Sequence, residues 1–222
     1  MSPEAVTGVV SLILAGTAVT LRIFLLSAMI AGPLAFLLGV LRTAQSARVR
    51  VLTTMWVEFF RGTSTVVQLF WLYFALPFLG VSLSAQQAAV LGLGLVHGAY
   101  ASEVVRGAIL AVPRNQWETA QALALPRLAT LRKVILPQAL PSMLPPLGNA
   151  AIFLLKGTSI ASIITVPELT FQSSLIVTRT MAIFQVMGCT LVIYYVLALL
   201  LVRLVRMLEA RSGAWRPARQ TP

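Results

Sequence analysis

The feature that most constrains the fold is a series of long apolar runs separated by clusters of basic residues. Of the 222 residues, 58% are hydrophobic and 10% are charged, whereas a soluble domain carries about 25% charged residues. The apolar runs are long enough to cross a bilayer, which takes about 20 apolar residues in a helix. The sequence therefore predicts an all-α polytopic membrane protein.

The distribution of the basic residues predicts the orientation of the chain. Of 17 Lys and Arg, 14 lie in three clusters: Arg42, Arg48, Arg50 and Arg61; the basic residues of 106–133; and those of 203–219. Basic residues beside membrane spans mark the cytoplasmic side. We therefore expect the N-terminus outside and the C-terminus in the cytoplasm. The net charge of +11 is interpreted as topology and contact with anionic lipid, with no nucleic-acid partner.

Five spans are predicted, at about residues 17–41, 51–79, 88–110, 140–155 and 181–205, after a short lead-in over 1–16. Residues 156–180 are more polar and are expected to form a broken segment near the outer face; whether it is re-entrant stays open. The whole of 1–211 is predicted to be a single transmembrane domain. The polar stretch 212–222 is predicted to be a disordered cytoplasmic tail.

Two features inside the spans carry packing predictions. Gly94 and Gly98 form a GxxxG step, which permits close contact between two helices. Cys189 is the single cysteine, so a disulfide within the chain is impossible. Because it lies in an apolar run, we expect its thiol to be buried as a small hydrophobic group.

The longest polar interruption, residues 113–137, is predicted to form two short helices outside the membrane. Asn115 is a suitable N-cap, and Glu118 lies three residues on, where its carboxylate can bond back to the cap. Pro126 is expected to begin the second helix and Pro137 to end it. The basic residues of the stretch predict that it is cytoplasmic. The residues alone leave open whether a partner docks there or the stretch is an ordinary loop.

The sequence lacks the residue combinations of familiar enzymes. Aspartate is absent, and one His with one Cys cannot build a zinc site. It contains neither a GxxxxGK[ST] phosphate loop nor a GxSxG nucleophile elbow. We therefore predict that the chain is not an enzyme, has no catalytic residue, and binds no metal or cofactor of its own.

Polar residues at membrane depth are candidates for a substrate path, because burying them in lipid is costly. Glu103 and Arg106 are three residues apart and are expected to pair. Glu58 and Arg61 can form an ion pair at the helix end or contact a partner. Lys156 can meet a substrate carboxylate or extend towards the interface, and the sequence does not decide between these. His97 is expected to be a packing residue. The complete set of path candidates is Gln68, His97, Tyr100, Ser102, Glu103, Asn149, Lys156, Gly157, Thr158 and Ser159.

The polar stretch resembles a known cytoplasmic loop. Permease subunits of binding-protein-dependent (type I) ABC importers carry an EAA loop, written E-A-A-x3-G-x9-I-x-L-P. The matching positions, with Trp117 beside them, are Glu118, Thr119, Ala120, Ala124, Val134, Leu136 and Pro137. Thr119, Ala124 and Val134 depart from the pattern, and each is small or conservative. The loss of glycine at Ala124 affects the expected sharpness of the turn.

Three further segments resemble the polar amino-acid branch of this family. They are VEFFRGTSTVVQLFWLYFALP at 57–77, GAYASEVVRGAI at 98–109 and LPPLGNAAIFLLKGTS at 144–159. Many amino-acid permeases read LKDTS where this chain has Gly157 in place of the acidic residue, so the substrate is not fixed by the resemblance. The first segment is also similar to permeases for ectoine and hydroxyectoine.

The resemblance implies one permease subunit of an ATP-driven importer in the bacterial inner (plasma) membrane. Its substrates would be polar amino acids or related zwitterions such as ectoine. Its partners would be a cytoplasmic ATP-binding subunit dimer that holds ATP and Mg²⁺, a second permease subunit, homologous or identical, and an extracytoplasmic substrate-binding protein. The rival hypotheses are a passive channel or ion-coupled carrier, and a membrane scaffold that transports nothing.

Overall fold

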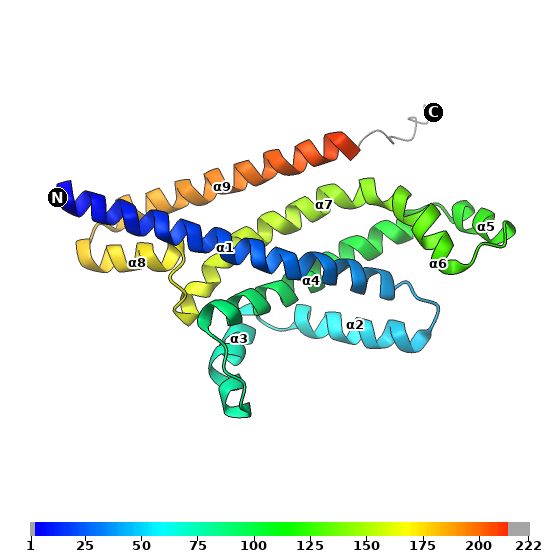
Figure 1. Cartoon of the computed structure of the whole chain (residues 1–222), viewed down its shortest axis with the longest axis horizontal. Helices are drawn as coiled ribbons and strands as arrows, with labels where there is room; N and C mark the ends of the chain where they lie inside the picture. The colour runs from blue at the N-terminus through cyan, green and yellow to red at the C-terminus, as the bar shows by residue number, and fades with distance from the viewer. Residues whose placement is uncertain (1–2, 213–222) are drawn as a thin grey trace.

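The computed structural model describes residues 3–212, and these are almost entirely helical (Figure 1). The α-helices are α1 (Pro3–Leu41), α2 (Ala47–Gly62), α3 (Thr65–Phe70), α4 (Ala85–Ala111), α5 (Arg114–Ala122), α6 (Arg127–Thr130), α7 (Leu136–Gly157), α8 (Leu169–Thr180) and α9 (Ile183–Ser212). π-Helical turns occupy Trp71–Ala75 and Leu131–Ile135, and 3₁₀ turns occupy Leu76–Leu79 and Thr158–Ile164. The predicted disordered tail, apart from Ser212, lies outside the described residues.

Long helices α1, α4, α7 and α9 run side by side as the body of the molecule, with α5 and α6 at one end (Figure 1). The N-terminus of α1 lies at the opposite end from this hairpin, and α9 ends on the hairpin side. Within residues 3–212, four helical segments are long and apolar enough to cross a membrane: Thr7–Leu41, Ala85–Ala111, Arg127–Ile164 and Ile183–Ala210. This confirms the all-α polytopic class.

The fifth predicted span is broken. Ala47–Gly62 and Thr65–Leu79 meet at an angle of 97°, so 51–79 is one span only if the bent pair is counted together. Thr63 has an extended backbone (φ −109°, ψ 152°), which interrupts the helix. The Gln68 amide group crosses the break, donating to the Phe60 carbonyl oxygen at 3.1 Å and to the Thr63 hydroxyl. The bend falls at the polar run 61–65, RGTST, but polar residues there are equally compatible with the cytoplasmic end of an unbroken span.

Two other predicted boundaries were too short. Helix α1 already begins at Pro3, so the expected lead-in over 1–16 is part of the first long helix. The fourth span reaches back from α7 through the π turn into α6, over Arg127–Ile164. The prediction that Pro137 ends a helix was therefore wrong, because Pro137 lies in the first turn of α7. The Leu136 N–H bonds to the Leu131 carbonyl in the wider π register, and this shift accommodates the missing N–H of proline.

Helices α1 and α4 pack closely, as the GxxxG step predicted. A methyl group added at Gly94 would lie 2.9 Å from Cβ of Ile30, and one added at Gly98 would lie 2.9 Å from Cδ2 of Leu34. Gly39 of α1 is the reciprocal position, because its added Cβ would lie 2.6 Å from Cβ of Val105. The absence of side chains at these positions lets the two backbones approach.

The prediction for Cys189 was wrong, because its side chain is exposed. It lies on α9, which covers the outside of the bundle and packs mainly on α7 and α8. Leu191, Val192 and Tyr195 of α9 are also exposed. In a membrane protein apolar side chains are stable against lipid, so an apolar run does not imply burial inside the protein.

Candidate functional site: the helical hairpin and the membrane grooves

The hairpin 113–137 is folded and firmly attached to the long helices. Ala120 is 2% exposed. Trp117, Val134 and Leu136 pack partly buried against a cluster from α4 and the residue after it, the π turn and α7, whose members include Val105, Ile109, Val112, Ile135 and Ala139. Gln138 of α7 donates a hydrogen bond to Gln116 of α5 at 3.1 Å. Arg127 donates to the Thr43 carbonyl at 2.7 Å, which joins the hairpin to the end of α1.

The turn between α5 and α6 explains the glycine of the loop pattern. Ala124, in the glycine position, has a left-handed backbone with φ 51°. Its N–H bonds to the Gln121 carbonyl at 2.8 Å, and the Leu125 N–H bonds to the Ala120 carbonyl at 3.1 Å. A glycine adopts this conformation without strain, whereas an L-residue pays about 1 kcal/mol or more. The turn is therefore as sharp as a glycine would make it.

The predicted capping of the hairpin was wrong in its details. Helix α5 begins at Arg114 with Pro113 in the N-cap position, so Asn115 lies inside the helix. Proline pre-sets φ for an immediate helix start. Glu118 instead lies 3.7 Å from Arg114 in an exposed pair. Pro126 precedes α6 rather than beginning it.

The outward side of the hairpin offers a mixed apolar and charged surface. Leu123 and Leu128 are 68% and 77% exposed, and the side chains of Glu118 and Arg114 are also largely exposed. Thr119 is exposed and lies beside Glu118. The surface therefore has apolar residues that a partner can cover and charges that can orient it.

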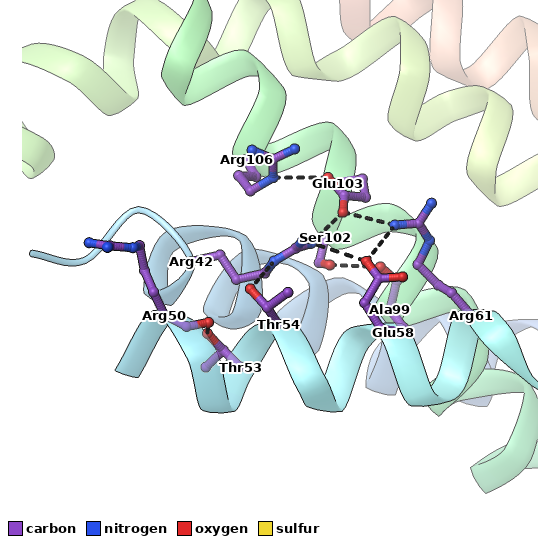
Figure 2. A network of polar contacts seen from close by, with 10 residues as sticks. All are labelled: Arg42, Arg50, Thr53, Thr54, Glu58, Arg61, Ala99, Ser102, Glu103 and Arg106. Atoms are coloured by element: carbon purple, nitrogen blue, oxygen red, sulfur yellow. Dashed lines mark hydrogen bonds and ion pairs between the residues drawn. The ribbon is translucent and has the colours of Figure 1, made fainter. Parts of the chain in front are cut away.

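A second polar feature is a charge cluster that joins α2 and α4 to the residue after α1 (Figure 2). Glu103 accepts from Arg61 at 2.8 Å, from Arg106 at 2.9 Å, and from Arg42. Glu58 lies 3.4 Å from Arg61. The predicted Glu103–Arg106 pair is therefore present, and Glu58 and Arg61 form the ion pair that the sequence allowed. The contacts of Arg42 and Arg61 with Glu103 were not predicted, because both residues are far from Glu103 along the chain.

Among the substrate-path candidates, four lie on the α2–α4 side of the bundle. Tyr100 donates to the Arg61 carbonyl at 3.2 Å, beside Glu103. Gln68 bridges the α2–α3 break. Ser102 is buried and donates to the Ala99 carbonyl at 2.6 Å. The Tyr100 and Gln68 contacts join neighbouring helices, whereas the Ser102 bond lies within α4. None of these three side chains, nor that of Glu103, lines the cavity that Lys156 lines.

The remaining candidates lie on or beside α7 and are divided among its faces. His97 of α4 is buried, with Nδ1 2.9 Å from the Leu93 carbonyl, as expected of a packing residue. It adjoins Gly157, where an added Cβ would lie 3.1 Å from the His97 ring. Thr158 is buried and donates to the Leu155 carbonyl at 2.7 Å, whereas Asn149 is exposed. Lys156 and Ser159 line a groove of about 580 Å³ between α7 and α9.

Sequence reasoning missed the structural role of Glu168. Its side chain is 0% exposed and caps the N-terminus of α8, accepting from the Thr170 and Phe171 N–H groups at 2.9 and 2.8 Å. Tyr194 of α9 donates its hydroxyl to the same carboxylate at 2.9 Å. Thr20 of α1 contacts it at 3.4 Å. The available signal was an acidic residue just before a helical stretch, which is an N-cap pattern.

Comparison with known proteins identifies the family. The model of the family described as "binding-protein-dependent transport system inner membrane component" matches residues 31–213, which begin in the last third of α1 and include the whole of α9. The chain belongs to this family. The match includes the folded hairpin, the charge cluster and the α7–α9 groove.

Relatives of this transport component extend over nearly the whole chain. A probable amino-acid ABC transporter permease of Sinorhizobium fredii is 38% identical over 92% of this chain and 89% of its own length. The glutamine transport system permease GlnP of Escherichia coli is 36% identical over 94% and 96%. The membrane-permease class predicted from the sequence is therefore confirmed, and a permease of this family works with ATP-binding subunits.

Solved structures share its fold. A crystal structure of an amino acid ABC transporter with histidines has a TM-score of 0.85 and 29% identity, covering 95% of this chain and 99% of that chain. An inward-facing form of the MetNI methionine ABC transporter has a TM-score of 0.70 at 22% identity and shows the fold alone.

Proposed function

We propose that this transport component is the permease subunit of an ATP-driven importer for polar amino acids or related zwitterions. The observation that carries the proposal is the folded hairpin, whose inner side is packed into α4 and α7 while its outer side is exposed. A partner that binds the outer side of the hairpin can therefore move the membrane helices. The amino-acid permeases among its relatives support the substrate class.

The partner that fits the hairpin is a cytoplasmic ATP-binding subunit dimer, which would hold ATP and Mg²⁺. Residues Trp117, Glu118, Thr119, Ala120, Ala124, Val134, Leu136 and Pro137 divide between two tasks. Glu118, Thr119, Ala124 and Pro137 are exposed, and the first two offer polar groups to the partner, whereas the buried or partly buried members hold the hairpin on the long helices. The continuous helical path from Arg127 to Ile164 transmits a displacement of the hairpin into the membrane.

The complete importer would contain a second permease subunit, homologous or identical, and an extracytoplasmic substrate-binding protein in a bacterial inner membrane. The hairpin and the end of α9 lie at one end of the bundle and the start of α1 at the other (Figure 1). Together with the basic clusters, this supports an outside N-terminus and a cytoplasmic C-terminus. Ectoine and hydroxyectoine remain substrates to be tested beside the amino acids.

The experiment compares two charge reversals in proteoliposomes that contain the permease with its ATP-binding subunit. Glu118→Lys places a cation on the exposed docking surface. We expect it to lower ATP-dependent uptake at least tenfold and to weaken co-purification of the ATP-binding subunit. Glu209→Lys, outside the hairpin, is the matched control and should retain both. Unchanged uptake by Glu118→Lys would contradict the proposal, and uptake without any ATP-binding subunit would favour a channel or ion-coupled carrier.

A further inference from the structure

The groove between α7 and α9 lies near the middle of the membrane span that α9 forms. Its walls carry the polar residues Lys156, Ser159, Tyr194 and Tyr195 among apolar side chains. At about 1.5 Å per residue, Tyr194 lies about 17 Å along α9 from Ile183 and about 24 Å from Ala210, the two ends of the span. Helix α7 ends at Gly157, beside the groove, and it stops well short of the end of the molecule that α1 and α8 reach (Figure 1).

Lys156 enters this groove with an unpaired charge. Its side chain is exposed to the groove, and within residues 3–212 its ammonium group has neither an ion pair nor a hydrogen bond. A cation at membrane depth is costly and normally pairs with an anion or faces a water-filled path. The ion pairs of the described chain lie in the charge cluster around Glu103 and on α5, and none of them includes Lys156.

A buried carboxylate, that of Glu168, lies behind the opposite wall of the groove, and the four donor groups around it favour its ionised form. The Tyr194 ring lines the groove, while its hydroxyl donates to the buried carboxylate of Glu168. That carboxylate is held in place by the N–H groups at the start of α8. The groove therefore has the unpaired Lys156 ammonium on its α7 side. On its α9 side, the Tyr194 ring separates it from the Glu168 carboxylate, to which the Tyr194 hydroxyl is bonded.

We propose that this groove binds a small zwitterion with no net charge, whose carboxylate pairs with Lys156 and whose cationic nitrogen faces the Tyr194 and Tyr195 rings. Aromatic rings attract cations through their faces, and the Glu168 charge behind Tyr194 adds to this attraction. The volume of about 580 Å³ is within the range of small-molecule sites. The proposal rests on the proposed transport function and names the charge class of the substrate.

The same separation of charges excludes other classes of substrate. A second carboxylate would meet the field of Glu168, and a second cationic group would meet Lys156. A neutral amino acid such as L-glutamine has one carboxylate for Lys156 and one ammonium group for the Tyr194 and Tyr195 rings. Ectoine also carries one carboxylate and one delocalised cation, which fit the same partners.

The first test measures which compounds the wild-type complex transports. The probes are L-glutamine, ectoine, L-glutamate, L-arginine and 4-aminobutanamide, which is glutamine without its carboxylate. ATP-dependent uptake into proteoliposomes is measured with the cognate binding protein present. We expect uptake of at least one neutral zwitterion and none of 4-aminobutanamide. Preferred uptake of L-glutamate or L-arginine would overturn the inference, whereas absence of ATP-dependent uptake of every probe would instead contradict the proposed function.

The second test removes the unpaired charge. Lys156→Met keeps the length of the side chain, and Arg179→Met removes an exposed cation at the outer end of α8 as the matched control. With saturating loaded binding protein, we expect Lys156→Met to lower uptake of the transported zwitterion at least tenfold while ATP hydrolysis continues. Lys156→Arg should restore part of the uptake, and Arg179→Met should resemble the wild type.

Two results of the second test would overturn the inference. One is uptake by Lys156→Met equal to that of the wild type, which would leave the groove as a site for lipid chains. The other is equal loss of uptake and of ATP hydrolysis in both Lys156→Met and Lys156→Arg, which would assign Lys156 a structural role. Neither result bears on the hairpin, so the proposed function stands or falls separately.

Discussion

At the scale of single residues, Glu103 is the acceptor on which three arginines converge. Arg42, Arg61 and Arg106 come from the end of α1, from α2 and from α4 (Figure 2). The Arg42 side chain is only 7% exposed, so its charge depends on this carboxylate. Removing a partner from a partly buried ion pair leaves an uncompensated charge, which is more costly than losing an exposed pair.

We therefore expect Glu103→Gln to lower the free energy of unfolding by about 1–3 kcal/mol. Glu58→Gln is the control, because the Glu58 side chain is 57% exposed and should cost about 1 kcal/mol or less. The measurement is thermal unfolding of the purified permease in detergent. Equal melting temperatures for the two variants would show that the cluster contributes nothing beyond a surface pair.

Local residue patterns were predictable from the sequence, but contacts between distant segments were not. The Glu103–Arg106 pair follows from helical spacing, and the packing role of His97 follows from its apolar surroundings. Arg42 joins the same carboxylate from another helix, and Glu168 meets Tyr194 across α8 and α9. Neither contact can be predicted from a local sequence pattern, because the paired residues are far apart along the chain. Asn115 was misplaced as a cap because Pro113 starts the helix earlier.

At the scale of secondary-structure elements, the most extensive helix packing is that of α1 on α4. Gly94 lies against Ile30 and the backbone of Ser27, whereas Gly107 on the same helix has no atom within 4 Å of an added Cβ. The two positions therefore separate the effect of packing from the effect of replacing glycine in a helix. A side chain at Gly94 must push the helices apart.

We expect Gly94→Val to lower the melting temperature by several degrees, corresponding to about 1–3 kcal/mol of overpacking, and Gly107→Val to leave it nearly unchanged. Both variants are measured by thermal unfolding in the same detergent. If Gly107→Val were as destabilised as Gly94→Val, helix propensity rather than close packing would account for the loss.

Element existence was more predictable than element boundaries. Span-length apolar runs predicted α1, α4, α7 and α9, and the polar stretch predicted the α5–α6 hairpin. The 97° break near Thr63 and the helical continuation through Pro137 were not predicted. At the break, the extended backbone of Thr63 interrupts the helix and the Gln68 side chain bridges it. At Pro137, a π turn lets the helix continue.

At the scale of the whole molecule, the hairpin and the α7–α9 groove are connected by one helical path. Arg127–Ile164 begins in the hairpin and ends beyond Lys156. A force on the hairpin can therefore reach the groove without crossing a flexible loop. Family membership, the folded hairpin and the placement of the groove together support a permease that a separate ATP-binding subunit drives.

The most direct test of this account asks what touches the hairpin in living cells. A photo-crosslinking amino acid is placed at Leu123, which is 68% exposed on the hairpin, or at Phe78, which is 91% exposed after α3. The account predicts that the Leu123 probe crosslinks to a cytoplasmic ATP-binding subunit and the Phe78 probe does not. Absence of that crosslink at Leu123, or labelling of Leu123 by an impermeant reagent from outside the cell, would contradict it.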